Sequence, residues 1–336
     1  MNQTHFNIPI FIPELACPFQ CIFCNQSKIS GQNKIPSKQE IIDKIDSHLS
    51  TIDTQNSDVR IAFFGGSFTA LPIAHQIELL SIAQEYLQNN HIKGIRISTR
   101  PDYINAENLK ILKEMGVTHI ELGAQSLDDD VLLQSGRGHS VEDVKNASDL
   151  ILKHGFVLGL QMMIGLPGDS RELAMKTAQL ISQFGASETR IYPTLVIEGT
   201  NLHSLYQKEK YVPISLEVAV KITADLVVFF QEKKIKILRM GLHSSVDLEL
   251  GKSLIAGPFH PHFKELVLSE IWKRRFEEYT FDTGYKAVEI FVSPLEINFA
   301  IGFKSSNRIL LQKILPKIEF KTDDSLQTLD FYVHYS

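Results

Sequence analysis

The sequence predicts an α/β fold: a partial (βα)6 barrel of the TIM type, followed by a small α+β domain. From residue 37 onward, helical and strand patterns alternate every roughly 25 to 45 residues, which is the spacing of βα units. Six such units can be followed, whereas a complete barrel has eight. After about residue 245 this alternation stops and shorter apolar segments follow. We therefore expect a barrel domain over residues 1–245 and an α+β extension over residues 246–336.

The strands of the barrel are expected where short apolar runs end in glycine or in a polar turn, at residues 8–12, 59–64, 95–98, 117–122, 156–164 and 189–195. The run 156–164 is apolar almost throughout, as for a strand covered on both faces. A further short strand is expected at 235–240. The C-terminal ends of these parallel strands should meet at one edge of the sheet.

The intervening helices are predicted from apolar residues at helical spacing and from their start and stop signals. Ser37 with Glu40 and Ser140 with Asp143 have the spacing of capping boxes. Gly116 follows the helix that begins near residue 105 and would supply a left-handed C-terminal residue. In the extension, helices are expected at 264–276 and 307–315, and strands at 287–292, 297–303, 318–321 and 330–333.

The composition is that of a globular protein. Of the 336 residues, 43% are hydrophobic and 22% are charged. No apolar run approaches the roughly twenty residues that a membrane span needs, and the first residues lack a basic segment followed by an apolar one. We therefore expect a cytoplasmic protein whose thiols stay reduced. The net charge of -5 gives no global attraction to nucleic acid, so an RNA partner would need a local basic patch.

All the cysteines lie in one loop after the first strand: Cys17, Cys21 and Cys24. Three thiolates in such a loop can bind three irons of a four-iron, four-sulfur cluster and leave the fourth iron without a protein ligand. A small molecule can coordinate to that iron, so the pattern favours catalysis over electron storage. Because the chain has only 3 cysteines, a second cluster with cysteine ligands is excluded.

Other interpretations of the three cysteines are less favoured. A disulfide would leave one thiol unpaired, so an odd number at this spacing argues against it. A structural zinc ion would need a fourth ligand, for which His5 is the candidate. The thiols could also be small core residues of no chemical consequence.

Short polar or glycine-containing turns follow the other predicted strands, at residues 65–68, 98–102, 123–126, 165–169 and 192–194. Each turn alone is explained by backbone geometry or by helix capping. Because the C-terminal ends of strands are where ligands bind in barrels, the turns together with the cysteine loop predict one binding site.

The Cys-x3-Cys-x2-Cys spacing, with an aromatic residue just before the last cysteine, resembles the cluster loop of radical S-adenosylmethionine (SAM) enzymes. Over residues 6–245 the chain resembles, within that superfamily, the group around the Elongator catalytic subunit. The resemblance is carried by residues 98–103, 120–126, 137–139 and 163–168. That subunit has more widely spaced cysteines and an acetyltransferase domain, for which the final segment of this chain is too short and has the wrong pattern.

The resemblance implies that Cys17, Cys21 and Cys24 bind one [4Fe-4S] cluster, whose remaining iron takes the amino and carboxylate groups of SAM. It also implies SAM contacts for residues in the turns: Phe23 beside the adenine, Gly65, Gly66 and Ser67 at the amino group, Arg100, Gln125 and Ser126 near the carboxylate and ribose, and Tyr192 toward the adenine.

The implied activity is that of a radical SAM enzyme. A flavodoxin or ferredoxin would supply an electron, SAM would be cleaved to methionine and a 5′-deoxyadenosyl radical, and the radical would abstract a hydrogen atom from a substrate. Two alternatives remain: an enzyme similar to coproporphyrinogen dehydrogenase, and a non-catalytic iron–sulfur protein for electron transfer or redox sensing. Electron carriers normally have a fourth cysteine ligand, which is missing here.

The sequence does not identify the substrate, for which transfer RNA (tRNA) and a small molecule are both candidates. Residues 233–239 and 273–275 are modest basic groups that could bind RNA phosphates or be solvated helix ends. Candidate contacts near the barrel mouth are Arg239, His243, His260 and His262.

Overall fold

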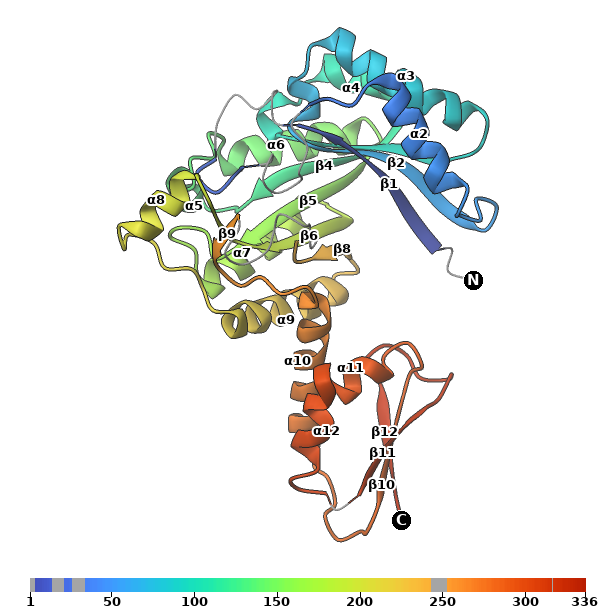
Figure 1. Ribbon diagram of the computed structural model, residues 1–336, viewed down its shortest axis with the longest axis vertical. Coiled ribbons are helices and arrows are strands. Elements are labelled where there is room, and N and C mark those ends of the chain that lie inside the picture. Colours follow the sequence, from blue (N-terminus) through green and yellow to red (C-terminus); the bar gives the residue numbers. More distant parts are fainter. Residues whose placement is uncertain (1–3, 14–20, 26–33, 243–252, 316) are drawn as a thin grey trace.

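The computed structural model describes residues 4–13, 21–25, 34–242, 253–315 and 317–336. A curled sheet with helices on its outer face forms the larger part of the molecule, and a smaller α/β unit lies below it (Figure 1). Helix α10 (Phe263–Glu278) runs from one part to the other. None of the helices in the described ranges combines the length and the apolar character needed to cross a bilayer.

The larger sheet has seven parallel strands in the order β1-β2-β3-β4-β5-β6-β8. Their bounds are Thr4–Ile12, Ser57–Gly65, Gly94–Thr99, Val117–Gln125, Val157–Ile164, Glu188–Pro193 and Lys236–Met240. β1 and β8 are the edge strands of this sheet, so it curls without closing. The predicted partial barrel is confirmed, including the short last strand.

Six longer helices cover the outer face of the sheet (Figure 1). They are α2 (Lys38–Leu49), α3 (Ile73–Gln88), α4 (Ala106–Glu114), α6 (Val141–Lys153), α7 (Arg171–Gln183) and α9 (Leu216–Glu232). Both expected capping boxes are present, at Ser37 with Glu40 and at Ser140 with Asp143. Gly116 adopts the expected left-handed conformation, with a φ of 84°.

Several short elements at the end of the barrel were not expected from the sequence. They are η2 (Phe68–Ala70), η3 (Pro101–Tyr103), α5 (Asp129–Gln134), α8 (Asn201–Gln207), and the pair β7 (Val196–Ile197) and β9 (Leu254–Ala256). α5 and α8 are one or two turns long, too short to show a hydrophobic period.

The two faces of the barrel sheet differ in polarity. Alternate residues such as Ile8, Ile61 and Ile97 are fully buried under the outer helices. On β5, Gln161 and Met163 of the opposite face are only half-buried. The expectation that this strand is covered on both faces is therefore wrong, because the inner face of the half-barrel carries polar side chains and stays partly open.

The C-terminal unit contains a three-stranded sheet in the order β11-β10-β12, with bounds Ile318–Thr322, Val288–Val292 and Phe331–Tyr335. Its helices are α11 (Ile297–Ile301), η4 (Phe303–Ser305) and α12 (Ser306–Leu311). The expected strand at 297–303 is wrong. The apolar residues there fit both an alternating and a helical period, and Gly302, with a φ of 87°, ends a short helix.

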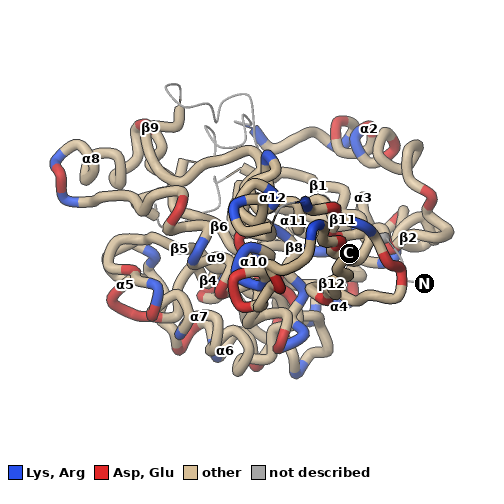
Figure 2. The backbone as a smooth tube through the Cα atoms, turned by 90° about the horizontal axis from the view of Figure 1, so that it is seen from below, with Lys and Arg blue, Asp and Glu red and all other residues tan. Residues whose placement is uncertain are grey.

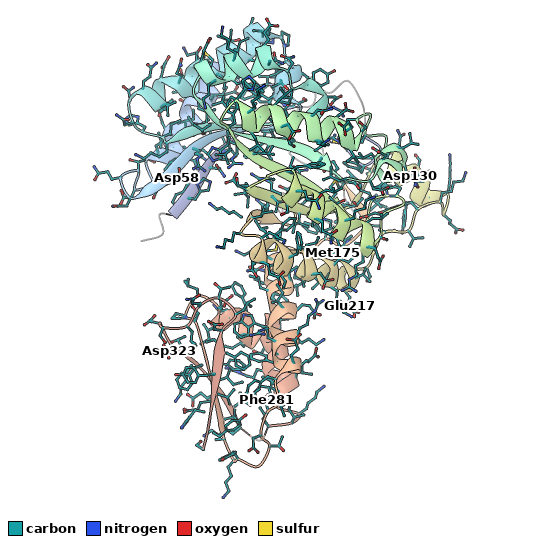
Figure 3. The ribbon with its side chains drawn as sticks, turned by 180° about the vertical axis from the view of Figure 1, so that it is seen from behind. Asp58, Asp130, Met175, Glu217, Phe281 and Asp323 are labelled. Atoms are coloured by element: carbon teal, nitrogen blue, oxygen red, sulfur yellow. The ribbon has the colours of Figure 1, made fainter. Side chains whose placement is uncertain are left out.

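α10 belongs to both hydrophobic cores. Phe263, Val267 and Ile271 pack in the core of the barrel, whereas Trp272 and Phe276 pack in the core of the C-terminal unit. Phe281 lies in that second core between the sheet and the helices (Figure 3). The expected boundary between residues 245 and 246 stays a prediction. Because α10 contributes to both cores, this helix does not belong to one unit alone.

Candidate functional site

The C-terminal ends of the barrel strands form one rim, near α5 and α8. Asp130 on α5 and Asp58 at the start of β2 lie at opposite ends of the half-barrel (Figure 3). The described part of the cysteine loop, residues 21–25, is at the rim end. Cys17 lies outside the described residues, so its predicted role as a cluster ligand stays a prediction.

Backbone hydrogen bonds hold the cysteine loop between two of the short helices. Ile22 N donates to Ser135 O at the end of α5 (3.1 Å), and Leu202 N on α8 donates to Ile22 O (2.7 Å). Within the loop, Cys24 N donates to Cys21 O (3.0 Å). This hydrogen bond closes a tight turn, so Cys21 and Cys24 lie near each other at the rim.

The apolar residues between these two cysteines anchor the loop. Ile22 and Phe23 pack against a buried cluster that includes Val196, Leu202 and Tyr211. The cluster joins β7 and α8 to the loop, so these unexpected elements have a clear structural role. Whether Phe23 also contacts an adenine ring stays a prediction.

The structure places Arg137 directly against Cys21. Arg137 Nη1 donates to Cys21 Sγ at 3.2 Å, and Nη2 donates to the carbonyl oxygen of Gly123. The Arg137 side chain comes from the segment between α5 and α6, far from the cysteine loop in sequence. The sequence marks residues 137–139 through the family resemblance but indicates no role for them.

Gly65 ends β2 in a conformation that only glycine adopts readily, with a φ of 116°. A Cβ atom at this position would lie 2.1 Å from Ile12 O and 2.8 Å from the ring of Phe11. The next residue, Gly66, donates from N to Ile12 O at 2.7 Å. The glycine turn is therefore fixed to the end of β1, close to where the cysteine loop begins.

The Ser67 hydroxyl lies in a buried hydrogen-bond network between β2 and β3. Its Oγ is 2.8 Å from Thr99 Oγ1, which also lies 2.6 Å from Thr69 Oγ1. Arg100 N donates to the same Ser67 Oγ at 3.2 Å. The network locks the two turns together. A contact between Ser67 and SAM stays a prediction.

Arg100 is buried and is held in place by neighbouring protein groups. Its Nε donates to Asp102 Oδ1 and its Nη2 to Asp102 Oδ2, both at 2.9 Å. Nη2 also donates to the backbone oxygen of Arg137 at 2.8 Å. These contacts link the turn after β3 to the segment that carries Arg137.

Gln125 sits at an irregular point of the sheet. Its φ is 66°, an uncommon value for a residue other than glycine, and the β4–β5 register shifts between Gly123 and Gln125. Gln161 Nε2 donates to Gln125 Oε1 at 3.1 Å, which places the amide on the inner face. Ser126 is buried, and its N donates to Ala124 O at 2.9 Å. Their predicted roles toward SAM are untested.

The turn after β5 is closed by its own aspartate. Asp169 Oδ2 accepts from Gly165 N at 2.8 Å, and Gly165 O accepts from the Tyr211 hydroxyl at 2.7 Å. Burial raises the pKa of Asp169 to about 6. These bonds tie the 165–169 turn to the segment that packs under the cysteine loop.

Tyr192 lies on the inner wall of the half-barrel with a charged neighbour. Arg190 Nη1 donates to the Tyr192 hydroxyl at 3.4 Å, and Arg190 Nε donates to Glu121 Oε2 at 2.8 Å. The guanidinium also lies 4.7 Å from the centre of the Phe64 ring. Although burial opposes it, the Glu121 carboxylate raises the pKa of Arg190, so this arginine stays charged.

The remaining candidates from the sequence, near the barrel mouth and at His5, have other neighbours in the structure than the rim residues described above. His260 and His262 pack against the ring of Phe303, with centroids 5.3 and 5.5 Å away. Arg239 Nε donates to Gly241 O at 3.1 Å, and His243 lies outside the described residues. His5, the second residue of β1, has its Nδ1 3.1 Å from Asp58 Oδ2 and lies roughly 20 Å by strand geometry from the end of that strand at Ile12. Among the described residues, no three His, Cys, Asp or Glu side chains are placed to hold a metal ion together, so the structure gives no support for a zinc site that includes His5.

The basic group at 273–275 is paired with acidic side chains. Arg274 donates to Asp225 (2.7 Å) and to Glu270 (3.0 Å), and Lys273 lies within 4 Å of Glu270 and Glu277. Blue and red segments accordingly alternate around α10 when the molecule is seen from below (Figure 2). This arrangement fits the solvated face of a helix better than a phosphate-binding patch.

The described residues fit an iron–sulfur cluster with a bound SAM. A thiolate-ligated cluster is negatively charged, and Arg137 places a cation at the Cys21 sulfur. Gly65 lets the turn after β2 pass directly against the end of β1, because a Cβ at this position would lie 2.1 Å from Ile12 O. The buried Ser98 Oγ and Arg137 Nε have no hydrogen-bond partner among the described residues.

Comparison with known proteins identifies the family. The model of the radical SAM superfamily matches residues 12–181, and that of the radical SAM C-terminal domain matches residues 187–273. The chain therefore belongs to the radical SAM superfamily, whose members are enzymes, and it is itself an enzyme. The superfamily implies a [4Fe-4S] cluster, SAM and a source of electrons.

Several curated relatives carry the name tRNA uridine(34) acetyltransferase, and others the name Elongator complex protein 3. The chain is 25% identical over 252 residues to a tRNA uridine(34) acetyltransferase of Dehalococcoides mccartyi, which covers 65% of this chain and 55% of the relative. It is 31% identical over 189 residues to human Elongator complex protein 3, covering 50% and 35%. The chain thus spans about half the length, or less, of these curated relatives.

A solved structure shares the fold. The archaeal Methanocaldococcus infernus Elp3 with an N-terminal deletion superposes with a TM-score of 0.64 at 20% identity, covering 82% of this chain and 64% of that one. At this identity the likeness establishes the fold alone. It confirms the half-barrel with a C-terminal domain.

Proposed function

We propose that this enzyme binds one [4Fe-4S] cluster through Cys17, Cys21 and Cys24 and uses it to cleave SAM reductively. The observation that carries the proposal is the position of Cys21 at the rim, between α5 and α8, with the Arg137 guanidinium 3.2 Å from its sulfur. When bound, the cluster would supply the electron that yields methionine and a 5′-deoxyadenosyl radical able to abstract hydrogen from a substrate.

The rim turns would bind and orient SAM. The turn at Gly65 and Gly66 is held against Ile12 at the end of β1, and we assign this turn to the SAM amino group. Gln125 and Ser126 lie at the end of β4, where they would approach the ribose. Arg100 and Ser67 would act partly by fixing the two turns, since both are already held by protein groups.

The inner wall would surround the reacting end of the cofactor. Tyr192 and Arg190 on β6, with Phe64 on β2, face the interior below the rim. The Glu121 carboxylate holds Arg190 in place. These groups would exclude water from a reactive radical while leaving the open side of the half-barrel for a substrate.

For the substrate we infer a tRNA. Support comes from the curated relatives, two of which are named for tRNA uridine(34) acetyltransferase activity in Dehalococcoides mccartyi and Methanocaldococcus infernus. The proposal covers hydrogen abstraction only, since acetyl transfer is an activity of those longer proteins. Binding of tRNA should weaken steeply with salt, because phosphate contacts release counterions. Absence of binding at low salt would contradict a tRNA substrate.

The cleavage reaction can be tested directly. The protein is reconstituted anaerobically with iron and sulfide, reduced, and supplied with SAM, and 5′-deoxyadenosine is quantified. Wild type should form it, whereas C24A should lose both the cluster and the product. The matched control is I22V, which changes the same loop without removing a thiol. If C24A retained a full cluster and SAM cleavage, the assignment of this loop would be wrong.

A further inference from the structure

We propose that Arg137 is a positioning residue that raises the reduction potential of the cluster through the Cys21 sulfur. This inference rests on the proposed function, because it requires Cys21 to be a cluster ligand. It gives a role to the 137–139 motif, and it concerns the electron that enters the site rather than the binding of SAM.

The Arg137 guanidinium is held rigidly. One terminal nitrogen donates to Cys21 Sγ at 3.2 Å, and the other donates to the Gly123 oxygen. Gly123 lies so close that a Cβ there would be 2.7 Å from Nη2. An arginine clamped between a backbone oxygen and a sulfur offers a fixed N–H···S hydrogen bond.

The backbone of Arg137 is fixed as well. Its N donates to Leu132 O at 3.0 Å, and its carbonyl oxygen accepts from Arg100 Nη2 at 2.8 Å. The flanking Gly136 and Gly138 have φ values of 61° and 74°, so the chain makes a tight turn on either side. The turn presents the side chain to the cysteine loop.

The charge of Arg137 has no carboxylate partner among the residues that the structure describes. Its side chain is nonetheless buried, with the residue 7% exposed. A buried cation without a counter-charge is costly. A negatively charged cluster at Cys21 would supply that counter-charge. Arg100, the neighbouring cation, is instead paired with Asp102.

A nearby titratable ring is neutral, so it adds no second charge. Burial, together with the charges of Arg137 and Arg100, lowers the pKa of His139 to about 3. The charge at the sulfur therefore comes from Arg137, which donates the hydrogen bond to Cys21 Sγ.

The expected electrostatic effect has a definite sign. The oxidised cluster takes one electron from an external low-potential donor and becomes more negative by one charge, with no bond made or broken. A cation and an N–H donor at a ligand sulfur stabilise the more negative state and raise the potential. Removing them should make the cluster harder to reduce.

The test is an EPR-monitored redox titration of the reconstituted full-length protein without SAM. R137Q keeps an N–H donor but loses the charge, and R137M loses both. At a fixed ambient potential we expect the reduced-to-oxidised ratio to fall about tenfold in R137M, which is about 59 mV for a one-electron couple. The ratio should fall less in R137Q, and in R137K it should stay closest to the wild-type value.

The control is R171Q, which removes an exposed arginine paired with Asp225, and it should titrate like wild type. Equal midpoint potentials for wild type and R137M, both with full iron content, would overturn the inference. Loss of the cluster in all three Arg137 variants would also overturn it, since Arg137 would then serve cluster retention. If wild type itself assembled no cluster, the proposed function would fail instead.

Discussion

Arg96 on β3 and Glu188 on β6 form an ion pair inside the half-barrel, with Nη2 and Oε2 2.5 Å apart and both side chains almost completely buried. Glu121 on β4 lies 3.6 Å from Arg96 Nη1 and 2.8 Å from Arg190 Nε. Charged side chains therefore connect three strands across the inner wall. They join β3, β4 and β6 by side-chain contacts, in addition to the backbone ladder of the sheet.

Replacing Arg96 with Met should destabilise the protein strongly. The change would leave Glu188 buried without its closest cation, and breaking one side of a buried ion pair typically costs about 3–5 kcal/mol. The free energy of unfolding from urea titration measures the effect. K221M is a suitable comparison, since Lys221 pairs with Glu217 on the exposed face of α9. The K221M protein should have the same free energy of unfolding as wild type. A loss below about 1 kcal/mol in R96M would show that the pair is not important for stability.

Replacing Gly65 with Ala should disturb the rim more than a typical glycine substitution. The new Cβ would meet Ile12 O at 2.1 Å in addition to the cost of a positive φ. Gly199 is the matched control: its φ is 78°, but nothing lies within 4 Å of an added Cβ. We expect G199A to cost about 1–2 kcal/mol. G65A should cost clearly more and should also weaken SAM binding, as measured by equilibrium dialysis. Equal effects of the two variants would contradict this.

His119 should make the protein less stable in mild acid. Burial, followed by the charges of Arg96 and Arg60, lowers the pKa of His119 to about 3, whereas the unfolded chain has an ordinary value near 6.5. As the pH falls below 6.5, His119 takes up a proton in the unfolded state, whereas in the folded state it stays neutral until the pH approaches 3. Stability is therefore full above pH 6.5 and is lost progressively toward pH 3.

The variant H119Q removes this titration. Between pH 7.5 and 5.5, wild type should lose about 1.4 kcal/mol more free energy of unfolding than H119Q does. Urea titrations of both proteins at the two pH values give the difference directly. An identical pH dependence in the two proteins would mean that His119 is protonated in the folded state.

The sequence was sufficient to predict the features that depend on local spacing. Cys21, Cys24 and Gly65 were located from their positions relative to strand ends, and the structure places them at one rim. The role of Arg137 was not predictable in this way. Its contact with Cys21 joins residues 116 positions apart, and only the folded half-barrel brings them together.

Two kinds of element escaped sequence reasoning for physical reasons. α5 and α8 have 6 and 7 residues, too few to show a hydrophobic period, and backbone hydrogen bonds join each of them to Ile22 of the cysteine loop. The segment 297–303 has apolar residues that suit both a strand and a helix, and tertiary packing of Ala300 decides for the helix. The charged inner wall, with Arg96 and Glu188, also required the strand register.

The most direct test of the central claim is EPR spectroscopy of the reduced, anaerobically reconstituted protein before and after addition of SAM. If three cysteines leave one iron open for the cofactor, the protein should contain four irons and four sulfides, and its spectrum should change when SAM binds. A tightly bound zinc ion in place of the cluster, or an iron spectrum that is unchanged by SAM, would contradict it.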